Sequence, residues 1–180
     1  LVEGLPLNIS NTLEKLKDID IIIFAGGISP SLEGEEMNVS ATGFKGGDRT
    51  DIEFPAVQRK VLAALKEAGK KVILVNFSGS AMALTPETKS CDAILQAWYP
   101  GEEGGTAIVN VLFGDYNPAG RLPITFYKSI DQLPDFENYS MKGRTYRYMQ
   151  EEPLFPFGYG LSYTTFAFGK IHINKNSLSA

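Results

Sequence analysis

The sequence of 180 residues contains a single cysteine and a single histidine. Cys91 has no partner for an internal disulfide, and a zinc site built on several Cys or His ligands is excluded. His172 lies in an alternating stretch near the C-terminus, and this alternation predicts an exposed strand position. A Ser-His-Asp or Cys-His triad would have to use this one histidine, so we expect neither.

The sequence also lacks a basic excess and a long apolar run. A formal net charge of -4 offers no basic surface to nucleic acid. No run approaches the roughly 18 apolar residues of a membrane span. Residues 1–6 resemble no signal peptide, and the chain does not begin with Met, so we expect a piece of a longer protein. The hydrophobic fraction of 43% suffices for the core of one domain.

Apolar runs and helical patterns alternate along the chain. Residues 21–25 are continuously apolar and precede two glycines, which predicts a strand buried on both faces. Residues 71–77 and 93–98 predict two further strands. Helical patterns cover residues 11–17 (capped by Ser10 or Asn11), 56–68 and 106–113, and residues 86–90 form a short polar helix or turn. This alternation predicts an α/β domain with a largely parallel sheet.

Right-handed crossovers place the loops after these three strands at one edge of the sheet. The first loop, residues 28–53, is far longer than the roughly 2–6 residues of an ordinary βα connection. It holds Glu33, Glu35 and Glu36 around a glycine. Clustered carboxylates disfavour one another's ionised form, which suits a carboxyl acid or base. The alternative is a solvated surface cluster, the usual state of acidic side chains.

Three other features allow more than one interpretation. Residues 101–105, Gly-Glu-Glu-Gly-Gly, lack the spacing of a phosphate-binding loop and would repel phosphate, so we interpret them as a turn and expect no cofactor. Trp98 and Tyr99 could stack on a sugar, but core or rim packing is the commoner role. Asp48 and Arg49 could order the loop or touch sugar hydroxyls. A surface ion pair or helix-entry contact is the favoured interpretation because such pairs are common.

Several stretches, in order over about residues 20–165, resemble family 3 of the glycoside hydrolases, the β-glucosidases and β-xylosidases. The most specific are Asn-Pro-Ala-Gly-Arg-Leu-Pro at residues 117–123 and Phe-Gly-Tyr-Gly-Leu at residues 157–161. The others are Gly34-Glu35 ahead of Gly47-Asp48-Arg49, Pro55-x-x-Gln58, residues 71–75, residues 97–105 and residues 111–116.

The resemblance implies a domain organisation. Residues 1–165 would form a three-layer α/β sandwich that normally follows a barrel domain. Residues 166–180 would be the truncated start of a fibronectin type III-like domain or a tail. The missing barrel and fibronectin-like domains would belong to the same parent chain, which the resemblance makes periplasmic or secreted.

The resemblance also implies a division of the chemistry. The barrel supplies an aspartate nucleophile, and this domain supplies the general acid/base from the loop after its first strand. Glu35 matches that position best, with Glu33 and Glu36 as runners-up. Asp48 and Arg49 are candidate substrate contacts. We expect a retaining, exo-acting β-glucosidase or β-xylosidase that is inactive without the barrel, with neither a metal nor a cofactor. A non-catalytic carbohydrate-binding or interdomain module is the alternative.

Overall fold

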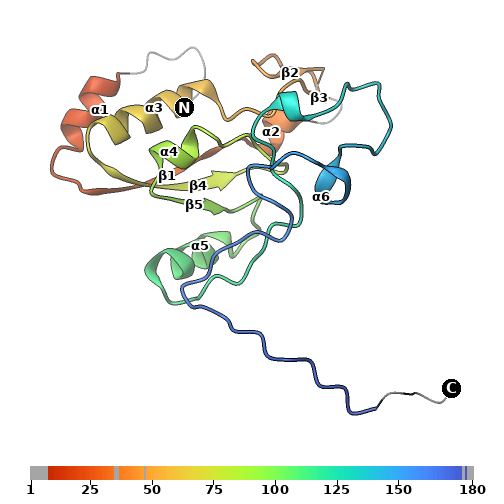
Figure 1. Cartoon of the computed structure of the whole chain (residues 1–180). Helices are drawn as coiled ribbons and strands as arrows, with labels where there is room; N and C mark the ends of the chain where they lie inside the picture. The colour runs from red at the N-terminus through yellow and green to blue at the C-terminus, as the bar shows by residue number, and fades with distance from the viewer. Residues whose placement is uncertain (1–7, 35–36, 47, 176, 178–180) are drawn as a thin grey trace.

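The computed structural model describes residues 8–34, 37–46, 48–175 and 177. Three parallel strands form the central sheet in the order β1-β4-β5 (Figure 1). They are β1 (Ile21–Gly27), β4 (Lys71–Phe77) and β5 (Ala93–Gln96). In the shared register, Ile23 lies opposite Ile73, which lies opposite Ala93.

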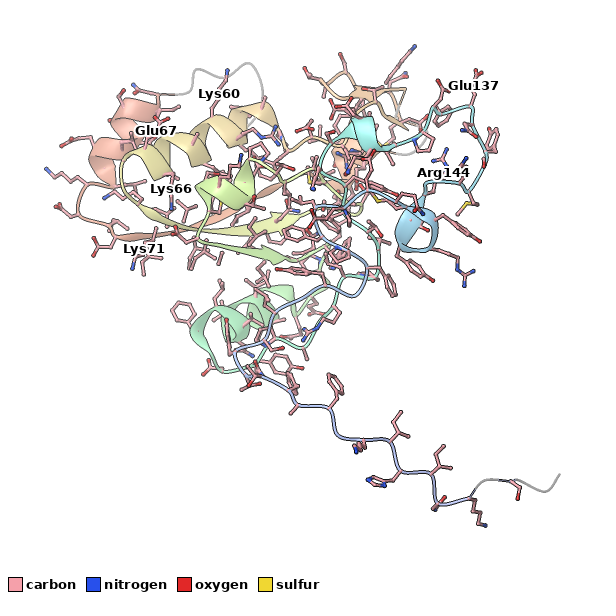
Figure 2. All side chains as sticks on the ribbon, in the orientation of Figure 1. Lys60, Lys66, Glu67, Lys71, Glu137 and Arg144 are labelled. Carbon is pink, nitrogen blue, oxygen red and sulfur yellow. The ribbon has the colours of Figure 1, made fainter. Side chains whose placement is uncertain are left out.

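Helices flank this sheet on both sides. Figure 1 shows α1 and α3 on one side of the sheet and α5 on the other. The helices beside the sheet are α1 (Ile9–Lys15), α3 (Ala56–Glu67), α4 (Glu87–Ser90) and α5 (Gly104–Phe113). Charged residues of α3, such as Lys60 and Glu67, lie on its exposed side (Figure 2). The expectation of a three-layer α/β sandwich with a parallel sheet is confirmed.

The predicted helix boundaries need two corrections at their N-termini. The first helix begins at Ile9, and its cap is Asn8, whose Oδ1 accepts a hydrogen bond from the Asn11 amide at 2.9 Å. The predicted caps were therefore wrong, because the helix starts earlier than its apolar pattern. Helix α5 begins at Gly104 rather than 106, so the glycine-rich turn contributes its first residues.

The prediction that the first strand is buried on both faces was wrong. Ile22 and Phe24 pack against the core beneath α1 and α3, but Ile21 and Ile23 are 54% and 48% exposed. Strand β1 lies at an edge of the sheet, and no element of the described chain covers its second face. Strand β4 lies between its neighbours, and Val72 and Leu74 are fully buried there, as its apolar run predicted.

The long segment after β1 has structure of its own. It contains α2 (Pro30–Glu33) and a two-stranded antiparallel hairpin of β2 (Phe44–Lys45) and β3 (Asp48–Arg49). Its end returns to the core through a parallel bridge between Glu53 and Ala83. The segment is therefore attached at its start to β1 and at its end, through Glu53, to the chain between β4 and α4.

The C-terminal third holds little regular structure. It contains η1 (Ile130–Gln132), α6 (Thr145–Tyr148) and a bridge between Phe126 and Phe155. Residues 166–173 run as an exposed extended segment without strand pairing, and His172 is exposed within it (Figure 1). The division at residue 165 and the fibronectin-like start remain predictions. No described helix has the length and apolarity to cross a bilayer.

Candidate functional site at the carboxyl ends of the strands

The loops after β1, β4 and β5 meet at one edge of the sheet. Glu33, the last residue of α2, contacts the β4–α4 loop at Gly79 and Ser80 and the β5–α5 loop at Tyr99. These contacts join residues 46 to 66 positions apart in the sequence. The predicted convergence of the three loops is confirmed.

Both carboxylate oxygens of Glu33 accept hydrogen bonds. Oε2 accepts from the Tyr99 hydroxyl at 2.5 Å and from the Gly79 amide at 3.3 Å. Oε1 accepts from the Ser80 hydroxyl at 2.6 Å. The side chain is half-buried. Glu33 is therefore a structured carboxylate rather than the solvated charge of the alternative interpretation.

Arg49 contacts Ser80, the residue whose hydroxyl binds Glu33. Its Nη1 donates to Ser80 Oγ at 2.9 Å and to the Ala81 carbonyl at 3.3 Å, and its Nε donates to the Asp51 carbonyl at 3.1 Å. Burial lowers the pKa of Arg49, and the negative charges of Glu33 and Asp51 oppose this effect. Arginine nevertheless stays cationic in proteins. We call Glu33, Arg49, Ser80 and Tyr99 the Glu33 cluster.

The favoured interpretation of Asp48 and Arg49 was wrong. Arg49 orders the loop through backbone carbonyls, and no ion pair joins it to Asp48, which is exposed. A side chain with several donors at fixed angles can join separated carbonyl groups, which a sequence motif does not reveal. Contact of either residue with a sugar remains a prediction.

Trp98 and Tyr99 have different surroundings. Trp98 packs against the core, with its ring edge-on to Phe126 at a centroid distance of 6.1 Å. This confirms core packing for Trp98. The Tyr99 hydroxyl instead bonds Glu33, and burial, followed by that hydrogen bond, raises the pKa of Tyr99 well above its usual range. Tyr99 is therefore a neutral hydrogen-bond donor.

Ser80 is also connected to three polar side chains, of which Asn76 and Ser78 are buried and Gln96 is half-buried. Asn76 Nδ2 donates to Gln96 Oε1 at 2.7 Å, and Gln96 Nε2 donates to Ser78 Oγ at 3.0 Å. Ser78 in turn donates to the Ser80 carbonyl at 2.8 Å. The sequence interpretation missed these side chains. Their signal was a polar residue at the carboxyl end of each of two apolar strands.

A second charged cluster joins α3 to α4 and to the end of the long segment that follows β1. Arg59 on α3 binds Glu87 through two hydrogen bonds of 2.7 and 3.1 Å, and it binds Glu53 at 2.8 Å. It also donates to the Ala83 carbonyl at 3.1 Å. Burial opposes the charge of Arg59, but the hydrogen bonds to Glu87 and Glu53 raise its pKa above the usual value. We call these three charged residues the Arg59 cluster.

The other members of the acidic loop are not all placed. Glu35 and Glu36 lie outside the described residues. Among the residues that the structure describes, no group of three or more His, Cys, Asp or Glu side chains could hold a metal ion. Of the candidate site residues that the structure describes, Glu33 and Arg49 lie together because both bind Ser80. Asp48 is exposed and lies apart from them.

The fold and this edge define a class of protein. Open α/β sheets bind ligands in the crevice outside the carboxyl ends of their strands, and here that edge carries an ordered carboxylate. Residues 6–163 match the glycosyl hydrolase family 3 C-terminal domain. The chain belongs to this family, which confirms the resemblance seen in the sequence.

Relatives of known name cover nearly the whole chain. A xylan 1,4-β-xylosidase from Xylanibacter ruminicola is 66% identical over 169 residues, which are 94% of this chain and 20% of that protein. A periplasmic β-glucosidase from Salmonella typhimurium is 38% identical over 94% of this chain and 22% of its own length. The chain therefore spans about a fifth of the length of these curated relatives.

The fold also matches solved structures. A β-glucosidase from Erythrobacter marinus superposes with a TM-score of 0.72 and 36% identity, over 89% of this chain and 21% of that chain. The match again covers a minor part of a longer enzyme, so this chain is similar to one domain of it.

Proposed function

We propose that the chain is the acid/base-bearing domain of a retaining, exo-acting β-glycosidase, and that the rest of a longer polypeptide supplies the nucleophile. The observation that carries the proposal is family 3 membership combined with a half-buried carboxylate at the carboxyl edge of the sheet. The 66% identity to a β-xylosidase makes terminal β-xylosides the first substrates to test and β-glucosides the second.

The chemistry requires two carboxyl groups about 5–5.5 Å apart. One attacks the anomeric carbon, and the other protonates the leaving oxygen and then takes a proton from water. The segment of residues 33–36 offers the second group. The first would come from the barrel, together with most of the sugar pocket.

Three carboxyl groups are candidates for the proton-transfer role. Glu35 is the first candidate because it matches the family pattern best. Glu33 has support from its position, but both of its oxygens already act as acceptors. To donate a proton to a leaving group, Glu33 would have to exchange one of these bonds. Glu36 is the third candidate.

Alanine substitution of each glutamate in the longer polypeptide tests the proposal. The acid/base variant should lose about 10²–10⁴-fold in kcat on a β-xyloside with a poor leaving group. It should lose less on an activated aryl xyloside, and azide should restore part of the rate. Glu14→Ala, an exposed carboxylate on α1, is the control. Wild-type rates for all three variants would contradict the proposal and favour the carbohydrate-binding or interdomain alternative.

The 180-residue chain alone should not hydrolyse aryl glycosides, because it would hold one of the two carboxyl groups. Glu35-dependent turnover by the purified chain would contradict this expectation.

A further inference from the structure

Tyr99 makes a contact that the proposed proton transfer does not use. Its hydroxyl reaches from the β5–α5 loop to Glu33 on the segment after β1. Its ring lies against the β4–α4 loop, where a Cβ on Gly79 would stand 2.7 Å from the ring and 2.7 Å from Glu33 Oε2. The absence of a side chain at Gly79 makes room for the Glu33–Tyr99 pair.

The backbone before Tyr99 is strained. Trp98 has φ of 57°, a conformation that costs about 1–3 kcal/mol in a residue other than glycine. The preceding residue, Ala97, still bonds the Asn76 carbonyl of β4, so the chain leaves the sheet at Trp98. The packing of the Trp98 ring on Phe126 holds this turn in place. Such strain persists where the surrounding structure requires it.

The hydroxyl protons of the cluster have defined directions. Arg49 can only donate, so Ser80 Oγ accepts from Arg49 and gives its own proton to Glu33. The Tyr99 hydroxyl keeps its proton and donates it in a hydrogen bond to Glu33. Two hydroxyl donors and one backbone amide therefore hold the carboxylate from two different loops.

We propose that Tyr99 is a positioning residue that holds Glu33 against the loops that follow β4 and β5. The inference rests on the proposed glycosidase function. It applies whether Glu33 or Glu35 moves the proton, because Glu35 follows Glu33 by two positions in the sequence. A displacement of about 1 Å in a catalytic group can cost about 10²-fold in rate.

The test is Tyr99→Phe in the longer polypeptide, since it removes the hydroxyl and keeps the ring against Gly79. We expect kcat on a β-xyloside to fall about 10- to 100-fold while KM stays within about threefold. In a Glu33→Ala background, measured with an activated aryl xyloside, Tyr99→Phe should have no further effect, because coupled residues are not additive. Ser80→Ala, which removes the other hydroxyl donor, should show the same pattern.

Tyr163→Phe is the matched control. It also loses a tyrosine hydroxyl bond, to the Val111 carbonyl at 2.6 Å, but it has no contact with the Glu33 cluster. It should keep wild-type kinetics. Thermal unfolding of each variant shows that it is folded, and Ser80→Ala decides the question if Tyr99→Phe does not fold.

Three outcomes would overturn the positioning role: an unchanged kcat in Tyr99→Phe, a change in KM alone, or the same loss with and without Glu33. These outcomes presuppose an active wild-type polypeptide. If the wild type hydrolyses neither β-xylosides nor β-glucosides, the proposed function fails, and the role of Tyr99 in it fails as well.

Discussion

The Glu33 and Arg59 clusters use similar side chains in different ways. Each joins three separate segments of the chain around a glutamate and an arginine. In the Arg59 cluster the two charges are in direct contact, and Glu87 is fully buried. In the Glu33 cluster a serine hydroxyl stands between arginine and carboxylate, and the carboxylate remains half-buried.

We expect the Arg59 cluster to stabilise the fold and the Glu33 cluster to serve the chemistry. A buried carboxylate bound by two hydrogen bonds to an arginine is satisfied, and breaking it leaves an uncompensated charge. Such a group joins α3 to α4 and is closed to substrate. Glu33 is held mainly by neutral donors at an edge where ligands can approach. Its position is fixed while part of its surface stays accessible.

The largest expected effect comes from Glu87→Ala. Removing one partner of a buried pair costs about 3–5 kcal/mol, and we expect about 3 because Arg59 keeps Glu53. Chemical denaturation of the chain, followed by fluorescence of its single tryptophan, measures the change in the free energy of unfolding. In the longer polypeptide, kcat per folded molecule should be unchanged.

The control for this prediction is Glu14→Ala, which removes an exposed pair with Lys17 and should cost less than about 0.5 kcal/mol. A loss for Glu87→Ala as small as that of the control would show that the Arg59 cluster does not stabilise the fold.

Gly79→Ala should affect kcat more than stability, the opposite of Glu87→Ala. The new Cβ would meet Glu33 Oε2 and the Tyr99 ring at 2.7 Å, so one of them must move. We expect about 1 kcal/mol of destabilisation, because the half-exposed edge can yield, and at least a tenfold loss in kcat of the longer polypeptide. Gly101→Ala is the control, since a Cβ there meets nothing within 4 Å. Equal kinetics for the two variants would contradict the assignment of this edge.

The smallest effect concerns an exposed carboxylate outside both clusters. The backbone amide of Val72, followed by Lys66, lowers the pKa of Asp92 below its ordinary value of 3.8. The ionised form is thus favoured by folding, and its stabilisation is present above about pH 4 and lost as pH falls through the folded pKa. Asp92→Asn should therefore lower stability more at pH 7 than at pH 2.

Denaturation midpoints at these two pH values measure the difference. Glu67→Gln, at an exposed position on α3 (Figure 2), is the control for the loss of one surface carboxylate. A constant gap between wild type and Asp92→Asn at both values would contradict the linkage.

Much of the fold was predictable because local patterns and chain chirality agree. The apolar run of β4 and the helical spacing of α3 gave their elements within a residue. The handedness of the crossovers then placed the three loops at one edge, and the contacts of Glu33 with Ser80 and Tyr99 confirm it. The acidic segment was located by composition alone.

The errors concern relations between distant residues. The run of residues 21–25 predicts burial, but whether a second layer covers β1 depends on what lies beside it. The neighbours Asp48 and Arg49 suggested an ion pair, whereas the guanidinium binds groups about 30 residues away. Glu87 lies in a short polar stretch, and its burial follows from Arg59 on another helix.

The sequence by itself determined the order of the elements, the family and the presence of an acidic loop after the first strand, because these depend on local periodicity and short motifs. The tertiary structure decided that Glu33 is bound by Tyr99 and Ser80 and that Glu87 is buried in contact with Arg59. Hydrogen bonding and burial depend on the groups that the fold brings within about 3 Å, and in both clusters those groups come from other segments of the chain.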